Sequence, residues 1–480
     1  MKKVDMIVKA PHFYTMEGAG VGYRSGVAMV VDSGKIIAIE KADLMGQEYQ
    51  AEEVLQLEHH AIMQGCFICP GFIDGHMHTS LAILRGLAQD TNNWMMYGLQ
   101  PFSAATTVEA SLAGSKMAII EAIKAGTTTL GDYSTNMDPV CNFISKIGAR
   151  GNITCTIREA KSRVYAPGEL YEFDPTRGEA SLRANLDLFE KWHGRSDGRI
   201  RVLFGPQGAD FLSEQLLLRV QRLAKERQTK IHMHTQQGDR ETYQVMQRYN
   251  KRPIAWLQEI GYLDETLIAV HLTDASDAEA RVVAESGASM IVCPGSIGII
   301  DGVVPPSLAF QDAGGNVALG SDQAPGNNCH NIINEMKLVA LFNKIKHQNP
   351  EVLPAWRALR MATIEGAKAV GLGDLVGSLE VGKRADFIAI DLHKPTMMPV
   401  YTHPMRNIVP NLVYSARGDE VALVAVDGKV IYQNSTFTTI DEAECLAAVA
   451  AYPEKIGQQA TEQFLRIDGT NAQFMRKGLL

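Results

Sequence analysis

The chain has 480 residues, of which 46% are hydrophobic and 21% charged, and its formal net charge at pH 7 is −8. This composition predicts a globular protein with a large core, and the acidic balance excludes a broad basic surface for nucleic acid or anionic lipid. No apolar run reaches the length of a membrane span or a signal peptide. We therefore expect a cytoplasmic protein without membrane contact.

The first 66 residues are predicted to be short strands. Apolar and polar residues alternate in 5–16, 26–41 and 52–63, with a turn at DSGK. Cys66 and Cys69 have C-x-x-C spacing, but no second pair exists to complete a zinc site, so core packing is the favoured interpretation. The seven cysteines in total are scattered and odd in number, which favours reduced thiols.

Residues 67–372 change to apolar strands that alternate with amphipathic helical segments, such as 108–126, 214–228 and 275–287. Eight strand-then-helix units favour an α/β fold of the (β/α)8 TIM barrel type over an open doubly wound sheet. The predicted strands are 68–80, 126–133, 152–160, 201–210, 230–236, 267–273, 289–296 and 316–322.

After the barrel, residues 373–436 return to a strand-turn-strand pattern, with VDGK as a turn signal, and residues 437–480 are predicted to form a helical tail. Strand-rich segments on both sides of a barrel predict that the two ends of the chain meet. We therefore expect a small β-sandwich domain built from 1–66 and 373–436.

Polar side chains occupy the ends of four predicted barrel strands, where catalytic groups of such barrels lie. His76 and His78 end the first strand, His234 the fifth, His271 the sixth and Asp322 the eighth. Residues two apart in a strand point the same way, so the first pair can reach one ion. Imidazoles and one carboxylate converging on a rim form a site suited to zinc or to ferrous iron, with room for water.

One histidine has two interpretations. His232 lies on the same strand face as His234 but one layer lower, so His234 is the better candidate ligand. His232 is expected either to support the ligands from behind or to belong to the core.

The segment PGFIDGHMHTS resembles the first-strand signature of the amidohydrolase superfamily, and the likeness continues over roughly residues 5–435. Within this superfamily, LAILRGLAQDTNNWM and GSDQAPGNN are most similar to the branch of chlorotriazine hydrolases, guanine deaminases and adenosylhomocysteine or methylthioadenosine deaminases. Later blocks similar to the superfamily are GTTTLGDY, IHMHTQQ, AVHLTDAS, ALGSDQAP, MATIEGAKAVGL and GSLEVGKRADFIAID.

The resemblance implies one divalent metal held by His76, His78, His234 and Asp322, with His271 beside the attacked carbon. Dinuclear members usually add a carboxylated lysine on strand four, and RVLFGPQGAD contains none. We therefore expect a mononuclear enzyme, for which zinc is the preferred metal and ferrous iron the second candidate. The expected reaction is hydrolysis of a non-peptide C–N bond of a small nitrogen-rich heterocycle. Asp322 would take the proton of the attacking water, and His271 would polarise the substrate or steady the oxyanion.

The sequence departs from the deaminases of this branch at Gln237, where they carry a glutamate that protonates a ring nitrogen. An amide does not shuttle protons at neutral pH. Three explanations of the missing glutamate stay open. Asp322 carries out all of the proton transfer, the leaving group needs less help, or Asp239 or Glu241 on the following segment takes the place of the glutamate. A second departure is Ile297, at a position where the branch often has asparagine.

Expected substrate contacts are Gln207, Trp94, Gln237 and His330, while Arg85 could pair either with an acidic substrate or with a neighbouring carboxylate. Two further functions stay open: displacement of chloride, thiol or another leaving group, including cyclic-amide opening, and a catalytically inactive scaffold. The family resemblance also implies a homodimer or larger homo-oligomer.

Overall fold

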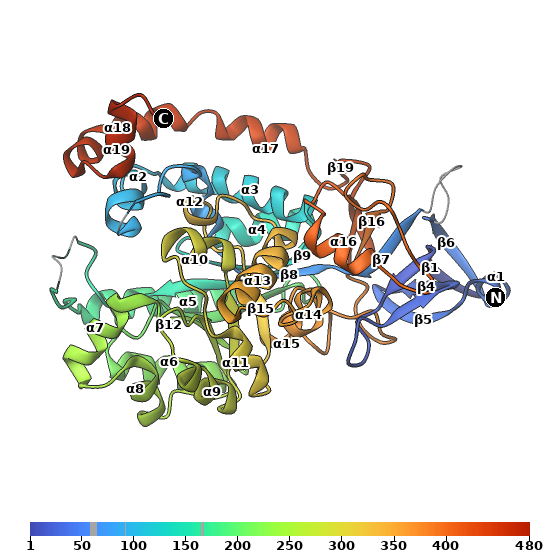
Figure 1. The fold of residues 1–480 in the computed structure, drawn as a ribbon, viewed down its shortest axis with the longest axis horizontal. Coiled ribbons are helices and arrows are strands. Elements are labelled where there is room, and N and C mark those ends of the chain that lie inside the picture. The colour runs from blue at the N-terminus through green and yellow to red at the C-terminus, as the bar shows by residue number, and fades with distance from the viewer. Residues whose placement is uncertain (58–64, 92, 164, 166–167) are drawn as a thin grey trace.

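The computed structural model describes residues 1–480 except 58–64, 92, 164 and 166–167. Figure 1 shows a barrel surrounded by helices, a β domain formed by both ends of the chain, and a helical tail along the outside of the barrel. The barrel carries the candidate site, and the other two parts pack against it.

Eight parallel strands follow one another around the barrel in chain order. The barrel closes where the first strand meets the segment after the last: the His78 N–H donates to the Asp322 carbonyl at 3.0 Å, and the Asp322 N–H donates to the His76 carbonyl at 2.8 Å. The predicted barrel is therefore confirmed. Its strands are β8 (Phe72–Met77), β9 (Thr127–Ser134), β10 (Arg150–Ile157), β11 (Ile200–Pro206), β12 (Ile231–Thr235), β13 (Leu267–His271), β14 (Ser289–Val292) and β15 (Val317–Leu319).

Helices cover the outside of the barrel, and several begin at side chains that cap their first turn. Thr107, Ser213 and Ser276 accept hydrogen bonds from backbone N–H groups of α3, α6 and α9. These helices are α3 (Val108–Lys124), α4 (Asp138–Ile147), α5 (Pro175–Trp192), α6 (Glu214–Glu226), α7 (Gly238–Tyr249), α8 (Pro253–Glu259), α9 (Asp277–Glu285), α10 (Pro294–Ile300), α11 (Ser307–Asp312), α12 (Ala324–Asn327), α13 (Ile332–His347), α14 (Ala355–Met361) and α15 (Ile364–Ala369). After β8 come η1 (Thr79–Leu84), the π-helix η2 (Met95–Leu99) and α2 (Gln100–Ser103).

The β domain contains two sheets, and one of them joins both ends of the chain. The first sheet has the order β5-β4-β1-β6, and the second the order β19-β18-β17-β16-β7-β2-β3. Phe13, Ile68 and Phe387 of the second sheet share a buried core with Met29 of the first. The strands are β1 (Lys2–Lys9), β2 (His12–Tyr14), β3 (Tyr23–Ser25), β4 (Val27–Asp32), β5 (Lys35–Lys41), β6 (Tyr49–Gln56), β7 (Cys66–Pro70), β16 (Phe387–Asp391), β17 (Val421–Val426), β18 (Lys429–Gln433) and β19 (Thr436–Phe437).

Some details of this domain differ from the expectation. β7 pairs with β16, so the domain extends to Pro70 rather than to residue 66, and the barrel begins at Phe72. A short helix, α1 (Ala42–Glu48), lies between β5 and β6, and α16 (Ile408–Tyr414) lies between β16 and β17. Of the strand expected over 52–63, positions 58–63 lie outside the described residues.

A buried ion cluster joins the barrel to the β domain. Arg150 begins β10, and its guanidinium donates to both carboxylate oxygens of Asp386 at 2.9 and 3.0 Å and to Asp427 at 2.7 Å. The side chains of Arg150 and Asp386 are only 2% and 1% exposed. A two-point guanidinium contact of this kind fixes the relative position of the barrel and the β domain.

The tail consists of α17 (Glu442–Val449), α18 (Pro453–Ile467) and α19 (Thr470–Arg476). The Phe464 ring of α18 packs on Phe102 of α2, with centroids 5.3 Å apart, and the Asn471 side chain donates to the Gln89 carbonyl at 2.8 Å. The tail therefore supports the segment between β8 and α3.

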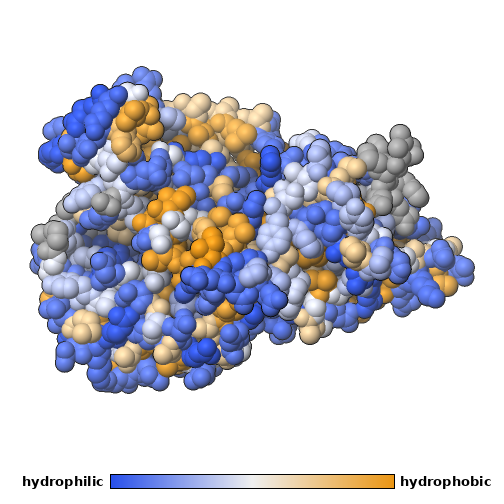
Figure 2. Space-filling view, in the orientation of Figure 1, coloured by the Kyte–Doolittle hydropathy of each residue, from blue (hydrophilic) through white to orange (hydrophobic). Residues whose placement is uncertain are grey.

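The outer surface is hydrophilic over most of the face that Figure 2 draws, with apolar side chains gathered over α10 and α13. Ile299, Leu341 and Ile345 of these helices are exposed. A membrane crossing would need a longer and more apolar helix than any that the described residues form.

Candidate metal centre and pocket

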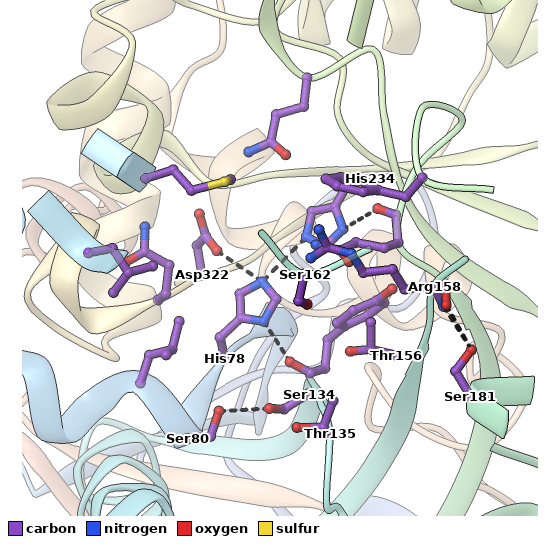
Figure 3. Close-up of a pocket in the computed structure, with 18 of the residues that line it drawn as sticks. His78, Ser80, Ser134, Thr135, Thr156, Arg158, Ser162, Ser181, His234 and Asp322 are labelled. Carbon is purple, nitrogen blue, oxygen red and sulfur yellow. Dashed lines mark hydrogen bonds and ion pairs between the residues drawn. The ribbon is translucent and has the colours of Figure 1, made fainter. Parts of the chain in front are cut away.

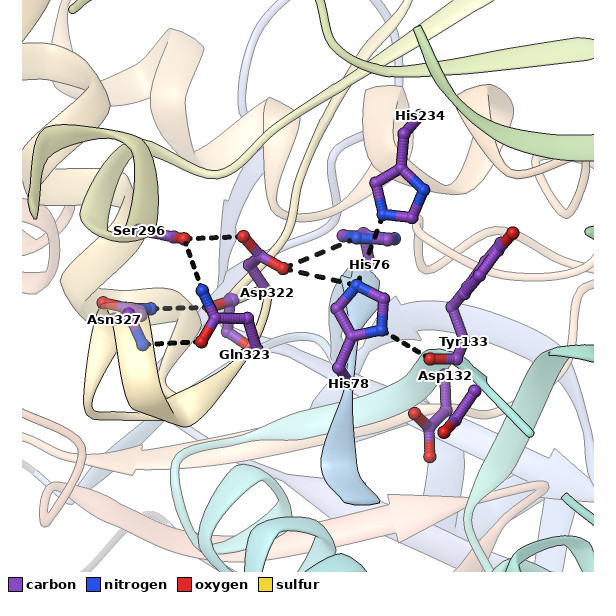
Figure 4. A network of polar contacts seen from close by, with 12 residues as sticks. His76, His78, Asp132, Tyr133, His234, Ser296, Asp322, Gln323 and Asn327 are labelled. Atoms are coloured by element: carbon purple, nitrogen blue, oxygen red, sulfur yellow. Dashed lines mark hydrogen bonds and ion pairs between the residues drawn. The ribbon is translucent and has the colours of Figure 1, made fainter. Parts of the chain in front are cut away.

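The expected ligands meet at one rim of the barrel, as Figure 4 shows. His76 and His78 come from the end of β8, His234 from β12, and Asp322 from the turn after β15. Asp322 Oδ1 lies 3.6 Å from His76 Nε2 and 3.5 Å from His78 Nε2, and His234 Nε2 lies 3.3 Å from His78 Nε2. The barrel therefore brings together the four side chains expected to hold the metal.

Each of the three imidazoles is oriented through its other ring nitrogen. His76 Nδ1 lies 2.8 Å from His232 Nε2, His78 Nδ1 lies 2.6 Å from the Tyr133 carbonyl, and His234 Nδ1 lies 2.8 Å from the Gln207 carbonyl. Carbonyl and imidazole acceptors on Nδ1 place the lone pair on Nε2. The three Nε2 atoms thus face the centre of the cluster.

His232 is one of these orienting groups, because its Nδ1 in turn lies 3.2 Å from the Thr154 hydroxyl. Its side chain is buried beneath the rim and does not line the pocket. Of the two interpretations for His232, support from behind a ligand fits this placement.

The electrostatics of the cluster suit a cation. Burial, together with the neighbouring imidazoles, lowers the pKa of His76 and His234 well below the ordinary value, so both rings are neutral at neutral pH. His76 Nε2 is buried and has no hydrogen-bond partner among the described residues. Three imidazole nitrogens and a carboxylate oxygen are a donor set that fits zinc or ferrous iron.

Asp322 is held from behind by the first turn of α10, the helix that follows β14. Ser296 donates its hydroxyl to Asp322 Oδ2 at 2.6 Å, and the Gln323 amide donates to Ser296 Oγ at 3.4 Å. The backbone φ of Asp322 is +58°, a conformation that non-glycine residues rarely adopt. Oδ1 is thereby left to face the imidazoles. Ile297, which follows Ser296, is buried and does not line the pocket.

His271 ends β13 and lines the pocket beside the cluster. Its φ is +79°, and neither ring nitrogen has a hydrogen-bond partner among the described residues. Burial lowers its pKa to about 4, which keeps the ring neutral. A neutral, unpartnered imidazole in a strained backbone is available to contact a substrate.

A pocket with a volume of about 580 Å³ opens onto the cluster, and Figure 3 shows part of its wall. Trp94, Gln207 and Gln237 line it, as expected of substrate contacts. Glu241 does not reach it, because its buried carboxylate accepts the Gln237 backbone N–H at 2.9 Å, and Asp239 is exposed outside it. Neither carboxylate occupies the place of the glutamate that Gln237 replaces.

Two expected contacts have other roles. His330 is fully buried, does not line the pocket, and places Nδ1 2.8 Å from the Ser321 hydroxyl, so the expectation that it contacts substrate does not fit the structure. Arg85 forms an ion pair with Glu121, the second of its two interpretations. The His330 backbone N–H donates to the same Glu121 carboxylate at 3.3 Å.

Three arginines that sequence reasoning missed also line the pocket: Arg158, Arg177 and Arg240. Arg158 directly follows β10, and Arg240 lies in the first turn of α7, after β12. Sequence reasoning could have identified Arg158 and Arg240 from their positions just beyond the carboxyl ends of barrel strands, because these ends form the active-site face of this fold.

Comparisons with known proteins agree with this geometry. The model of the amidohydrolase family matches residues 67–431. The 5-methylthioadenosine/S-adenosylhomocysteine deaminase of Thermoanaerobacter pseudethanolicus is 33% identical over 374 residues, which cover 78% of this chain and 83% of that protein.

Solved structures show the same fold. An adenosine deaminase from Xanthomonas campestris with bound zinc has a TM-score of 0.85 and 25% identity, covering 95% of this chain and 99% of its own. The zinc complex of an atrazine chlorohydrolase from Arthrobacter aurescens has a TM-score of 0.81 at 18% identity, covering 94% of this chain and 100% of its own.

Proposed function

Because the chain belongs to the amidohydrolase family and is a metal-dependent hydrolase of C–N bonds, we propose that it removes ammonia or an amine from a small amino-substituted nitrogen heterocycle. The observation that carries this proposal is the cluster of three inward-facing Nε2 atoms and Asp322 Oδ1 at the base of a pocket. The deaminase relative and the zinc-bound adenosine deaminase support it.

We assign one divalent ion to His76, His78, His234 and Asp322. Zinc is the preferred ion, and ferrous iron is the second candidate. The chemistry that such an ion supplies is a water whose pKa falls from about 15.7 to about 7. A single ion is supported by β11, which contains no lysine that could bridge a second one.

Asp322 is placed to move the protons of the reaction. Ser296 fixes the orientation of the Asp322 carboxylate through Oδ2, so the carboxylate lies beside the cluster where it can accept a proton from the attacking water and deliver it to the departing amine. His271 is neutral and donates its one N–H to the oxygen on which charge develops. Trp94, Gln207 and Gln237 contact the heterocycle, the last through its amide.

Gln237 supports a second candidate, displacement of a leaving group such as chloride or a thiol, or cyclic-amide opening. An amide does not protonate a ring nitrogen, and chloride leaves without a proton. An inactive scaffold has no such support, because an unused site has no reason to keep three oriented imidazoles and a fixed carboxylate.

The test is ammonia or amine release from a panel of aminopurines, aminopyrimidines, aminopteridines and aminotriazines by the zinc-loaded and iron-loaded protein. H271Q is expected to lose about 100-fold or more in kcat/KM, whereas H347Q, at the exposed end of α13, keeps full activity. Chloride or thiol release without ammonia would favour the second candidate. No release of any kind and no bound metal would favour the scaffold.

The family resemblance leads us to propose a homodimer or larger homo-oligomer. Light scattering during size-exclusion chromatography measures the mass of the assembly, and a monomer at micromolar concentration would contradict the proposal.

A further inference from the structure

A fully buried glutamate lies behind the residues that hold Asp322. Glu335 is in the first turn of α13, outside the pocket. Its hydrogen-bond donors in the described part of the chain are all neutral: the Gly295 backbone N–H at 2.8 Å, the Asn327 amide at 2.9 Å and the Asn334 amide at 3.3 Å. An apolar residue of similar size would avoid the cost of burying a carboxyl group, so stability alone does not explain Glu335.

The contact with Gly295 leads to the Asp322 carboxylate. Glu335 Oε2 accepts the Gly295 N–H, and the next residue, Ser296, donates its hydroxyl to Asp322 Oδ2 at 2.6 Å. Gly295 is packed so closely that a Cβ there would overlap Asn327 and lie 2.8 Å from Glu335 Oε1. Glu335 thus fixes the backbone position from which the Ser296 hydroxyl reaches Asp322.

The contact with Asn327 leads to the Asp322 backbone. Asn327 Nδ2 lies 2.9 Å from Glu335 Oε1 and 2.8 Å from the carbonyl of Ser321, the residue before Asp322. The peptide that Asn327 holds therefore precedes the strained φ of +58° at Asp322. Figure 4 shows Ser296 and Asn327 on the side of Asp322 that faces away from the imidazoles.

Both contacts require an acceptor at position 335. The Gly295 N–H can only donate. The Asn327 amide also contacts the Cys329 carbonyl at 3.0 Å, so turning it over would place its oxygen against the carbonyls of Ser321 and Cys329. Burial raises the pKa of Glu335 to about 8, and the hydrogen bonds from Gly295 and Asn327 oppose this rise. A proton on either carboxylate oxygen would meet a further donor, so the surroundings fit the carboxylate.

We infer that Glu335 is a positioning residue for Asp322. Through Gly295 and Ser296 it orients the Asp322 carboxylate, and through Asn327 and Ser321 it holds the Asp322 backbone. This inference rests on the proposed function, because it takes Asp322 as a ligand of the metal.

Zinc affinity and the visible spectrum of the cobalt-loaded protein test the inference without a substrate. E335Q keeps one acceptor and E335M keeps none. Competition with a chelating indicator is therefore expected to show a loss of zinc affinity of about 10-fold for E335Q and about 100-fold for E335M. The absorption bands of bound Co²⁺ depend on its ligands and their geometry, so both variants are expected to shift them.

N343A is the matched control on the same helix. Asn343 is also buried and polar, but its amide contacts the Ser307 hydroxyl at 3.4 Å and the Val339 carbonyl at 2.9 Å, away from Asp322. N343A is expected to lower the urea midpoint of the metal-free protein while the zinc affinity and the cobalt spectrum stay native. This pattern separates a general loss of stability from a change at Asp322.

Double-mutant cycles with S296A and N327A test the route from Glu335 to Asp322. In at least one of these backgrounds E335Q is expected to lower zinc affinity less than it does in the native protein, because the contact through which Glu335 acts is already absent. Additive losses in both cycles would overturn the inference.

Two further results would also overturn it: native zinc affinity and a native cobalt spectrum in both E335Q and E335M, or failure of both to fold while N343A folds. A native protein that binds no metal would overturn the metal assignment together with this inference. Metal binding that responds to E335Q and E335M, without ammonia or amine release by the native protein, would count against the proposed reaction and support the role of Glu335.

Discussion

Replacement of His232 by alanine tests whether the second layer of the site controls metal binding. In the native protein His76 Nδ1 lies 2.8 Å from His232 Nε2, and both side chains are buried. The variant leaves the His76 N–H without an acceptor and its ring free to rotate. An unsatisfied buried donor costs about 1–3 kcal/mol, which corresponds to a loss of roughly 10- to 100-fold in metal affinity.

The assay is competition for zinc between the protein and a chelating indicator, with urea unfolding of the metal-free variant as a check on the fold. T154V removes only the contact of 3.2 Å behind His232, so its zinc affinity is expected to fall by less than that of H232A. H347Q serves as the surface control. A folded H232A protein with the native zinc affinity would refute the idea that His232 orients His76.

Three further changes separate stability from chemistry. R150M leaves Asp386 buried without its cation, while Asp427 keeps its longer ion pairs with Arg199 and Arg384, so urea unfolding should show a loss of about 3–5 kcal/mol in the free energy of unfolding; a loss below about 1 kcal/mol would contradict this. Burial raises the pKa of Glu241 from 4.5 to about 8, so its contribution to stability is present below pH 4.5 and is lost as the pH rises through 8. E241Q should lack this decline in unfolding titrations between about pH 5 and about pH 8, and parallel curves for both proteins would refute it. Q237E should raise kcat/KM on the order of 100-fold for heterocycles whose ring nitrogen must be protonated, measured by ammonia release; an unchanged rate would show that proton transfer at this position is not limiting.

The barrel and the meeting of the expected ligands at its rim were predictable from sequence because both depend on strand periodicity. His76 lies in β8 and His78 directly after its last residue, and His234 and His271 lie at or next to the ends of their strands. Each is thus placed by the regular part of the fold. The assignment of these residues as ligands stays a prediction until a metal is measured, as does the cytoplasmic location.

The pocket wall was not predictable in the same way, because loops and short helices place it. β15 ends at Leu319, and the chain then turns through α12, which returns His330 to the interior rather than to the pocket. Arg158 and Arg240 both pack on Phe211, a contact between the loop after β10, the loop after β11 and the first turn of α7 that no local pattern contains. The β domain extends to Pro70 because β7 pairs with β16, and only Gly71 separates β7 from the first barrel strand β8.

The candidate metal cluster and the closure of the barrel depend on the same residues. The backbone hydrogen bonds that close the barrel link His76 and His78, at the end of β8, to Asp322 in the turn after β15. A change at this closing position would disturb the fold and the cluster together. Gln237 and Arg240 lie after β12, away from the closing strands, so a substitution there alters what faces the substrate and leaves the imidazoles in place. This separation is consistent with a chain that keeps the expected ligand cluster while it carries an amide at Gln237 on the wall of the pocket.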